Sequence, residues 1–203
     1  NYRRTISETK RAAILNAARD NFLKGGYSRA AMAEIARDAD VSTATLYKHF
    51  ASKEALFTAV VGSIYETMDP PALDDIERAT AREVLTSICN TYAKQQFEGQ
   101  MNGMLRIVIA EVPSSPQLAH AVFERGVTVR YDQFQQALDV LVKRGDLKPH
   151  DTKTGVRILG GMVKEFIVWP ALFAKDFQRP HDIDHKIAFC IDAYLKMHGR
   201  IQQ

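Results

Sequence analysis

Apolar residues recur at helical spacing along almost the whole chain, and no segment alternates apolar and polar residues for long enough to predict a strand. The pattern therefore predicts an all-α fold. We expect about nine helices, and they lie at residues 7–24, 31–38, 43–50, 52–68, 78–97, 101–112, 116–144, 151–174 and 182–199.

Glycine, proline and aspartate residues mark the ends of these segments. Gly25-Gly26 supplies a left-handed residue that ends the first helix, and Asp40 marks a tight turn after the second. Pro70-Pro71 stops the fourth helix, which predicts a connection at 69–75. Pro170 falls inside a helical pattern, so we expect a kink or an end near Trp169.

The composition fits a globular protein that folds without disulfide bonds. The chain has 203 residues, of which 46% are hydrophobic, and this is ample for a packed core. Cys89 and Cys190 have neither the number nor the spacing of a disulfide framework or a zinc site, which favours a reducing cytoplasm. No apolar signal peptide and no membrane span are expected.

The distribution of charge points to a polyanion near the N-terminus. The net charge is only +3, but basic residues outnumber acidic ones within residues 1–60, whereas the remainder is nearly neutral. Such asymmetry favours nucleic-acid binding by the first third of the chain. It also arises by chance in many enzymes.

Residues 31–50 fit a DNA-binding helix-turn-helix, in which the first short helix braces a second one that enters the major groove. Ser42 is placed to cap the second helix. Leu46 and Phe50 share its inner face, whereas Ala44 and Lys48 point outward. The alternative is the ordinary solvated face of a small helix.

The order of residues from Val41 to Leu56, preceded by Ile35-Ala36 and Gly25-Gly26-Tyr27, closely resembles the DNA-binding domain of the TetR/AcrR family of repressors. The resemblance covers about fifty residues. It implies a three-helix helix-turn-helix DNA-binding domain at 1–51 and a helical domain for effector binding and dimerisation at 52–203. The segment 105–111 and the Trp169-Pro170 kink look like the AcrR-type branch.

The resemblance also implies which residues meet double-stranded operator DNA. Thr43, Ala44, Thr45 and Lys48 would face base edges, and phosphates would be held by Ser42, Tyr47, His49 and Lys53. For Lys53, a position in the first turn of its helix agrees with phosphate binding.

Two positions depart from the family pattern. Ala30-Ala31 replaces a common threonine pair, which removes a cap hydroxyl, and Asp40 replaces a common glycine in the turn. Arg3 and Arg4 are expected either to reach DNA from a flexible arm or to belong to a disordered tail.

The last two predicted helices carry broad apolar faces, which the resemblance assigns to a homodimer. The expected interface residues are Val156, Leu159, Gly160, Val163, Ile183, Ile187, Ile191 and Tyr194.

Large, pliable side chains between the two ends of the chain fit either a plain core or a site for a small apolar effector, and the resemblance favours the effector site. The expected lining residues are Tyr92, Met104, Ile107, Met162, Phe166 and Trp169. Arg106, Glu111 and Glu165 are candidates for a polar end of the ligand or for salt bridges and surface positions.

No cofactor or catalytic set is predicted. His181 and His185 stand one helical turn apart, but acidic residues beside them at a helix start are ordinary capping groups, and no metal site is expected. No Ser/His/Asp set or phosphate-binding loop is present. The leading hypothesis is a bacterial, ligand-responsive repressor. An enzyme and an architectural DNA-binding protein without an effector are the alternatives.

Overall fold

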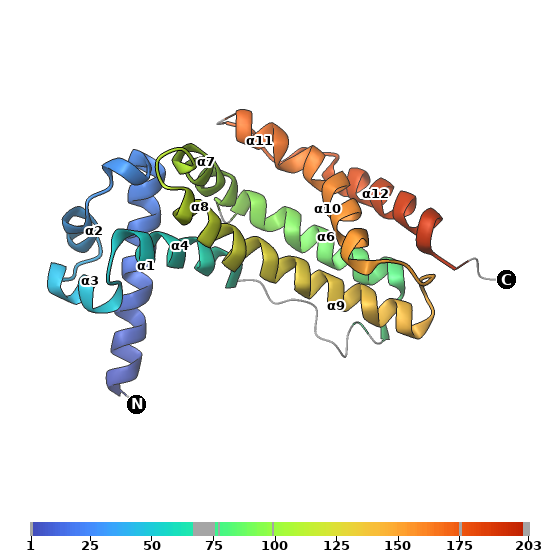
Figure 1. Cartoon of the computed structure of the whole chain (residues 1–203), viewed down its shortest axis with the longest axis horizontal. Helices are drawn as coiled ribbons and strands as arrows, with labels where there is room; N and C mark the ends of the chain where they lie inside the picture. The colour runs from blue at the N-terminus through green and yellow to red at the C-terminus, as the bar shows by residue number, and fades with distance from the viewer. Residues whose placement is uncertain (1, 67–75, 77, 99, 175, 201–203) are drawn as a thin grey trace. The chain divides into compact units, whose positions relative to one another are not determined.

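The structure is a computed structural model that describes residues 2–66, 76, 78–98, 100–174 and 176–200 (Figure 1). Within this part of the chain the regular structure is helical, apart from one isolated antiparallel bridge between Leu147 and Gly199, and this confirms the all-α prediction. The helices are α1 (Tyr2–Arg29), α2 (Met32–Asp38), α3 (Thr43–His49), α4 (Lys53–Glu66), α6 (Ala81–Glu98), α7 (Met101–Glu111), α8 (Pro116–Val122), a π-helical segment (Phe123–Thr128), α9 (Val129–Arg144), α10 (Thr152–Ile167), α11 (Trp169–Phe173) and α12 (Ile183–His198).

Two of the long predicted helices are interrupted. The segment 116–144 contains a π-helical stretch between α8 and α9, which the periodicity did not predict. The segment 151–174 divides after Val168, where Trp169 begins α11 with Pro170 in its first turn, so the predicted kink is confirmed.

The ends of two other helices also bear on the predictions. The first helix begins at Tyr2 rather than near residue 7, so the prediction of a flexible arm before Ser7 was wrong, because the backbone there is helical. The side chains of Arg3 and Arg4 lie outside the described part. The connection predicted at 69–75, and Met68 before it, also lie outside the described residues.

The helices form two compact units. The N-terminal unit comprises residues 1–67 and 103–126, and the C-terminal unit comprises residues 68–102 and 127–203. The N-terminal unit therefore contains α4, most of α7 and α8 in addition to the helix-turn-helix. The functional boundary after residue 51 remains a prediction.

Three aromatic rings form the centre of the N-terminal unit, where α1 packs against α2 and α4. The ring of Phe22 lies 4.9 Å from that of Phe57, and Tyr27 lies 5.2 Å from Phe57, both in edge-to-face geometry. Such pairs stabilise a core beyond their burial alone. The chain reaches this cluster through a kink at Gly26, whose φ of 78° suits glycine, and this confirms the predicted left-handed residue.

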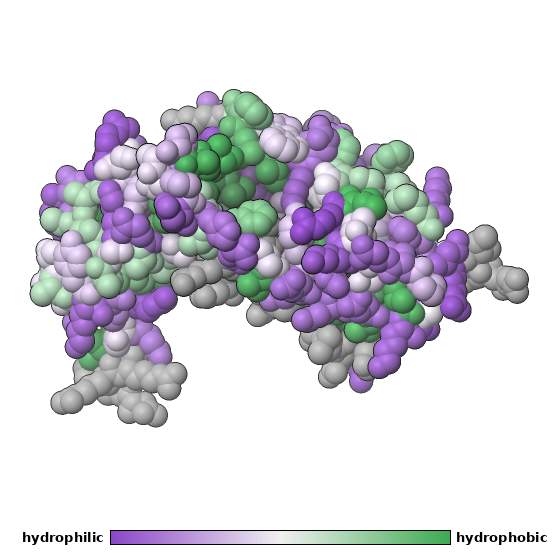
Figure 2. Space-filling model, in the orientation of Figure 1, coloured by the Kyte–Doolittle hydropathy of each residue, from purple (hydrophilic) through white to green (hydrophobic). Residues whose placement is uncertain are grey.

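The C-terminal unit is a bundle in which α10 packs against α6, α9 and α12, and α6 also packs against α12 and α9 (Figure 1). The visible surface over α9 is mainly hydrophilic (Figure 2), as expected for a helix with one face in the core. The cysteines are both free and buried, and burial, with a smaller contribution from Cys190, raises the pKa of Cys89 to about 12.

Most of the residues expected at a dimer interface belong to the core of this bundle. The apolar faces of α10 and α12 turn toward each other and toward α6 and α9, and most of these side chains are buried within one chain. Their role in a dimer remains a prediction. Only Gly160 of the eight is partly exposed. The buried residues are Val156, Leu159, Val163, Ile183, Ile187, Ile191 and Tyr194.

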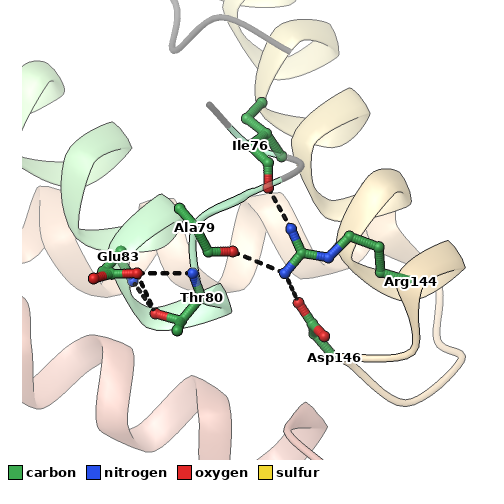
Figure 3. A network of polar contacts seen from close by, with 6 residues as sticks. All are labelled: Ile76, Ala79, Thr80, Glu83, Arg144 and Asp146. Atoms are coloured by element: carbon green, nitrogen blue, oxygen red, sulfur yellow. Dashed lines mark hydrogen bonds and ion pairs between the residues drawn. The ribbon is translucent and has the colours of Figure 1, made fainter. Parts of the chain in front are cut away.

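A polar network fixes the start of α6 to the end of α9 (Figure 3). The Arg144 guanidinium donates to the carbonyl oxygens of Ile76 and Ala79 and pairs with Asp146. Next to it, Thr80 and Glu83 form a capping box, with 2.8 Å from the Thr80 amide nitrogen to the Glu83 carboxylate. Arg144 therefore ties the end of α9 to the residues that precede α6.

Two histidines close the far end of the bundle around Tyr194. The His150 Nδ1 lies 2.8 Å from the Lys148 carbonyl oxygen and donates to it, and the Nε2 forms a hydrogen bond of 2.8 Å with the Tyr194 hydroxyl. The ring of His198 stacks on His150 at 4.0 Å. A Cβ on Gly155 would lie 2.4 Å from the Tyr194 oxygen, so only glycine fits there.

We expect the stability of the protein to fall in mild acid because of His198. Burial, followed by the charges of His150 and Lys148, lowers the pKa of His198 below its usual value. The unfolded chain, with a histidine pKa of about 6.5, then binds this proton more readily than the folded chain does. This contribution to stability is therefore full above about pH 6.5 and is lost as the pH falls through the lowered value.

Thermal unfolding of the wild type and of His198→Gln, measured between pH 8 and pH 5, checks this expectation. The wild type should lose more of its melting temperature than the variant over this interval. Equal losses would contradict the assignment to His198.

Candidate nucleic-acid interface

The second helix of the helix-turn-helix begins and ends as its sequence requires. Ser42 is the N-cap of α3, and its hydroxyl accepts from the Thr45 amide at 3.1 Å, which confirms the predicted cap. The preceding turn places Asp40 at a φ of 52°, the left-handed region that the turn was expected to need. By contrast, Ala31 at the start of α2 gives no side-chain cap, as expected from the missing hydroxyl.

The helix α3 has one buried face and one exposed face. Leu46 and Phe50 are buried and fix its rotation about its own axis. Tyr47 is 49% exposed, although it is large and partly apolar. The surface over α2 and α3 carries pale and hydrophilic residues rather than a strongly hydrophobic patch (Figure 2). The other exposed residues are Ser42, Thr43, Ala44 and Lys48, and Thr45 and His49 are half-buried.

This exposed face has the chemistry that the major groove requires. Small side chains at Thr43 and Ala44 let a backbone approach closely, a hydroxyl donates or accepts, and the Lys48 ammonium donates to guanine O6 or N7. The Thr45 hydroxyl is already 2.8 Å from that of Ser42, so it is held in place before any contact with DNA. The structure therefore brings together seven of the eight predicted residues on one short helix and its cap.

Lys53, the eighth predicted residue, has other partners. Its ammonium donates to the carbonyl oxygens of Tyr27, Ser28 and Ala30 at 3.0, 3.3 and 3.2 Å, and it lies 4.6 Å from the centre of the Tyr27 ring. An ammonium has three donors, and all three are used here. The geometry thus favours a structural role for Lys53 over the expected phosphate contact.

The segment that Lys53 holds also receives a contact from α7. The Ser28 hydroxyl donates to the Glu111 carboxylate at 3.0 Å, and Ser114 donates to its other oxygen at 2.9 Å. Glu111 therefore anchors the turn between α1 and α2. Burial, followed by the neighbouring carboxylate of Glu54, raises the pKa of Tyr27, so its phenol stays neutral beside Lys53. Sequence periodicity gives no signal for either anchor.

The residues expected to line an effector site are divided between the two units. Met104 and Ile107 belong to the N-terminal unit, and the other four belong to the C-terminal unit. Met104 is buried, whereas Trp169 is 53% exposed. Phe166 lies beneath the Lys186 ammonium, 5.4 Å from its ring centre. Their shared role in binding remains a prediction.

The sequence predicted neither a metal site nor a membrane span, and the described residues bear on both predictions. His181 and His185 are both exposed, and the residues that the structure describes contain no cluster of three or more His, Cys, Asp or Glu side chains suited to a metal ion. In the same part of the chain, every helix is too short or too polar to cross a membrane.

Comparison with protein families identifies the chain. The family model described as "AefR-like transcriptional repressor, C-terminal domain" matches residues 83–200, and the model described as "Bacterial regulatory proteins, tetR family" matches residues 14–60. The chain belongs to the TetR family. The members of this family are transcriptional regulators, and the second match contains the whole of α2 and α3.

Individual TetR-family relatives agree with this assignment. The HTH-type transcriptional regulator UidR of Escherichia coli K12 is 41% identical over 78 residues, which are 38% of this chain and 34% of UidR. The chain thus spans about a third of the length of the curated relatives that it matches. A solved TetR-family regulator from Mesorhizobium loti is 25% identical with a TM-score of 0.84, covering 96% of this chain and 98% of that one. The Flavonoid-responsive Regulator FrrA is also 25% identical, with a TM-score of 0.74 and coverages of 94% and 97%.

We expect Lys53→Met to lower the stability of this TetR-family protein, because three carbonyl oxygens, two of them in partly buried hydrogen bonds, lose a charged donor. Hydrogen bonds to charged groups contribute about 2 kcal/mol in net terms, which corresponds to a melting temperature lower by about 4–8 °C. Lys48→Met is the matched control, since Lys48 is exposed, and its melting temperature should not change. A stable Lys53→Met variant with weaker DNA binding would instead support the phosphate contact.

Proposed function

We propose that this chain is a ligand-responsive repressor that binds palindromic double-stranded operator DNA as a homodimer in the bacterial cytoplasm. A small apolar effector releases it from the DNA. The observation that carries the proposal is the exposed face of α3, where small and polar side chains surround Lys48 while Leu46 and Phe50 anchor the helix in the core. A helix held in this way presents a fixed set of groups to the major groove.

The roles of individual residues in this proposal follow from their position on α3. Thr43, Ala44, Thr45 and Lys48 face base edges and set the operator sequence. Ser42, Tyr47 and His49 contact phosphates and set the register. Lys53 supports the interface from behind by fixing the carbonyl groups at the end of α1.

The proposed dimer uses a second face of α10 and α12, because their larger apolar faces are already buried. Phe189 on α12 is 67% exposed, and Met197 lies two turns further along the same helix, also exposed. On α10, Ile158 and Gly161 are exposed. Large apolar side chains exposed along two packed helices favour contact with a partner subunit.

The proposed effector site lies in the domain at 52–203, among the residues predicted from the sequence. The name of FrrA states that it responds to flavonoids, and its similarity over most of both chains supports a small-molecule effector here. We place no catalytic step in this protein, since members of the family are regulators of transcription.

The test of DNA recognition is selection of binding sites from a pool of random double-stranded DNA, followed by affinity measurement at the selected site. We expect a palindrome with half-sites about one helical turn apart. Lys48→Ala should cost about 1–3 kcal/mol at this site if Lys48 contacts a base. Lys143→Ala, an exposed lysine at the end of α9, is the control and should bind as the wild type does. Selection that yields no preferred sequence would refute operator recognition.

The dimer is tested with charge on the exposed face of α10 and α12. We expect Ile158→Asp combined with Phe189→Asp to convert the dimer to a monomer, because two buried carboxylates would lack partners. Light scattering at micromolar concentration measures the mass. Val129→Asp, on the exposed side of α9, should leave the dimer intact. A wild-type monomer under these conditions would be incompatible with the proposal.

A further inference from the structure

Buried amide oxygens without a hydrogen-bond partner gather in one short stretch of the C-terminal unit. Within the described part of the chain, four such oxygens lie between residues 90 and 102, on α6 and at the start of α7. Proteins rarely bury a polar atom without a partner, because its desolvation is not compensated. Four of them within thirteen residues therefore suggest a functional reason. The four residues are Asn90, Gln95, Gln96 and Asn102.

The orientation of the Asn102 amide is fixed by its own hydrogen bond. Its Nδ2 donates to the Gln96 carbonyl oxygen at 3.2 Å, and a flipped amide would place two oxygens against each other there. The Oδ1 is therefore a true acceptor. Asn102 is only 7% exposed, so solvent does not satisfy this oxygen.

Gln96, whose backbone carbonyl oxygen holds Asn102, carries a second buried amide. The residue is 3% exposed, and its Oε1 also lacks a partner among the described residues. Tyr92 stands one helical turn before Gln96 on α6, so the two side chains leave the helix on the same face. The guanidinium of Arg130, from α9, lies 5.2 Å above the Tyr92 ring.

An aromatic pair begins at the residue that follows Gln96 in the sequence. The rings of Phe97 on α6 and Phe177, in the connection before α12, lie 6.1 Å apart with 34° between their planes. Two buried acceptor oxygens in a segment that also carries Tyr92 and Phe97 match a molecule that combines an apolar or aromatic body with a donor group. A purely apolar molecule would leave both oxygens unpaired.

We propose that Asn102 and Gln96 form a polar subsite that accepts hydrogen bonds from a hydroxyl or N–H group on an otherwise apolar effector. The inference rests on the proposed function and refines it, because it names the chemical group that the effector must carry. Tyr92 belongs to this subsite, as the sequence predicted for the effector site, whereas Gln96 and Asn102 were not predicted.

The first test needs no ligand. Gln96→Met keeps the volume of the side chain and removes the unpaired oxygen, so the ligand-free protein should melt about 2–4 °C higher. Gln133→Met, at an exposed glutamine of α9, is the control and should melt at the wild-type temperature. A melting temperature that falls in Gln96→Met relative to this control would show that the oxygen has a structural partner, and would overturn the subsite.

The second test uses two probes that differ in one donor. Phenol carries a hydroxyl, and anisole carries the same ring with a methyl ether that cannot donate. Ligand-observed NMR should show binding of phenol to the free wild-type protein at least about fivefold tighter than binding of anisole, because one hydrogen bond is worth about this factor. In Asn102→Leu and Gln96→Met the preference should disappear.

Equal binding of phenol and anisole, binding of neither, or a preference that survives in both variants would overturn the subsite. None of these measurements uses DNA. If the protein does not bind an operator but still prefers phenol, the proposed repressor function is refuted and the subsite is supported. If it binds an operator but shows no preference for phenol, only the subsite is refuted.

Discussion

The packing around α3 depends on one ammonium group. The helix α1 is kinked at Gly26, where φ is 78°, and the carbonyl oxygens of its last turn have no partner within the helix. Lys53 supplies donors to three of them from the first turn of α4. The end of α1, the entry to α2 and the start of α4 are thereby joined at one point. Since α3 lies between α2 and α4 in the chain, the contacts of Lys53 hold both the segment before α2 and the start of α4.

The aromatic cluster explains why the ammonium can stay there. Tyr27 packs against both Phe22 and Phe57, and its ring lies beneath the Lys53 ammonium. A cation over an aromatic face is attracted by the ring, and the attraction grows as water is excluded. The carbonyl groups and the ring thus compensate the charge from several directions. Lys53 therefore contributes to stability through contacts within the protein, whereas the side chain of Lys48 is exposed.

Local signals in the sequence predicted most of the helices because capping and turn chemistry act over a few residues. Ser42, Asp40, Gly26 and Pro170 behave as their types require. The dimer interface remains a prediction, because periodicity identifies an apolar face on α10 and α12 without telling whether its own bundle or a partner covers it. Ile187 and Ile191 face inward, whereas Phe189 between them faces out.

The candidate site shows the same limit. The order of residues on α3 predicted the exposed face, since one short helix carries it. The contacts of Lys53, Glu111 and Asn102 could not be predicted, because each depends on residues distant in the chain or on the rotation of a second helix. A polar residue at a buried position of an apolar pattern, as at Gln96, is the one available signal.

The helix α7 gives the polar subsite a physical connection to the DNA-binding end. Its first residues, Met101 and Asn102, belong to the C-terminal unit, and the rest belongs to the N-terminal unit. Its last residue, Glu111, accepts from Ser28, whose own carbonyl oxygen is held by Lys53. Leu23 of α1 packs so closely against Gly103 that a Cβ there would lie 2.6 Å from it. A ligand that bound Asn102 would therefore contact the first turn of the helix whose last residue accepts the hydrogen bond from Ser28.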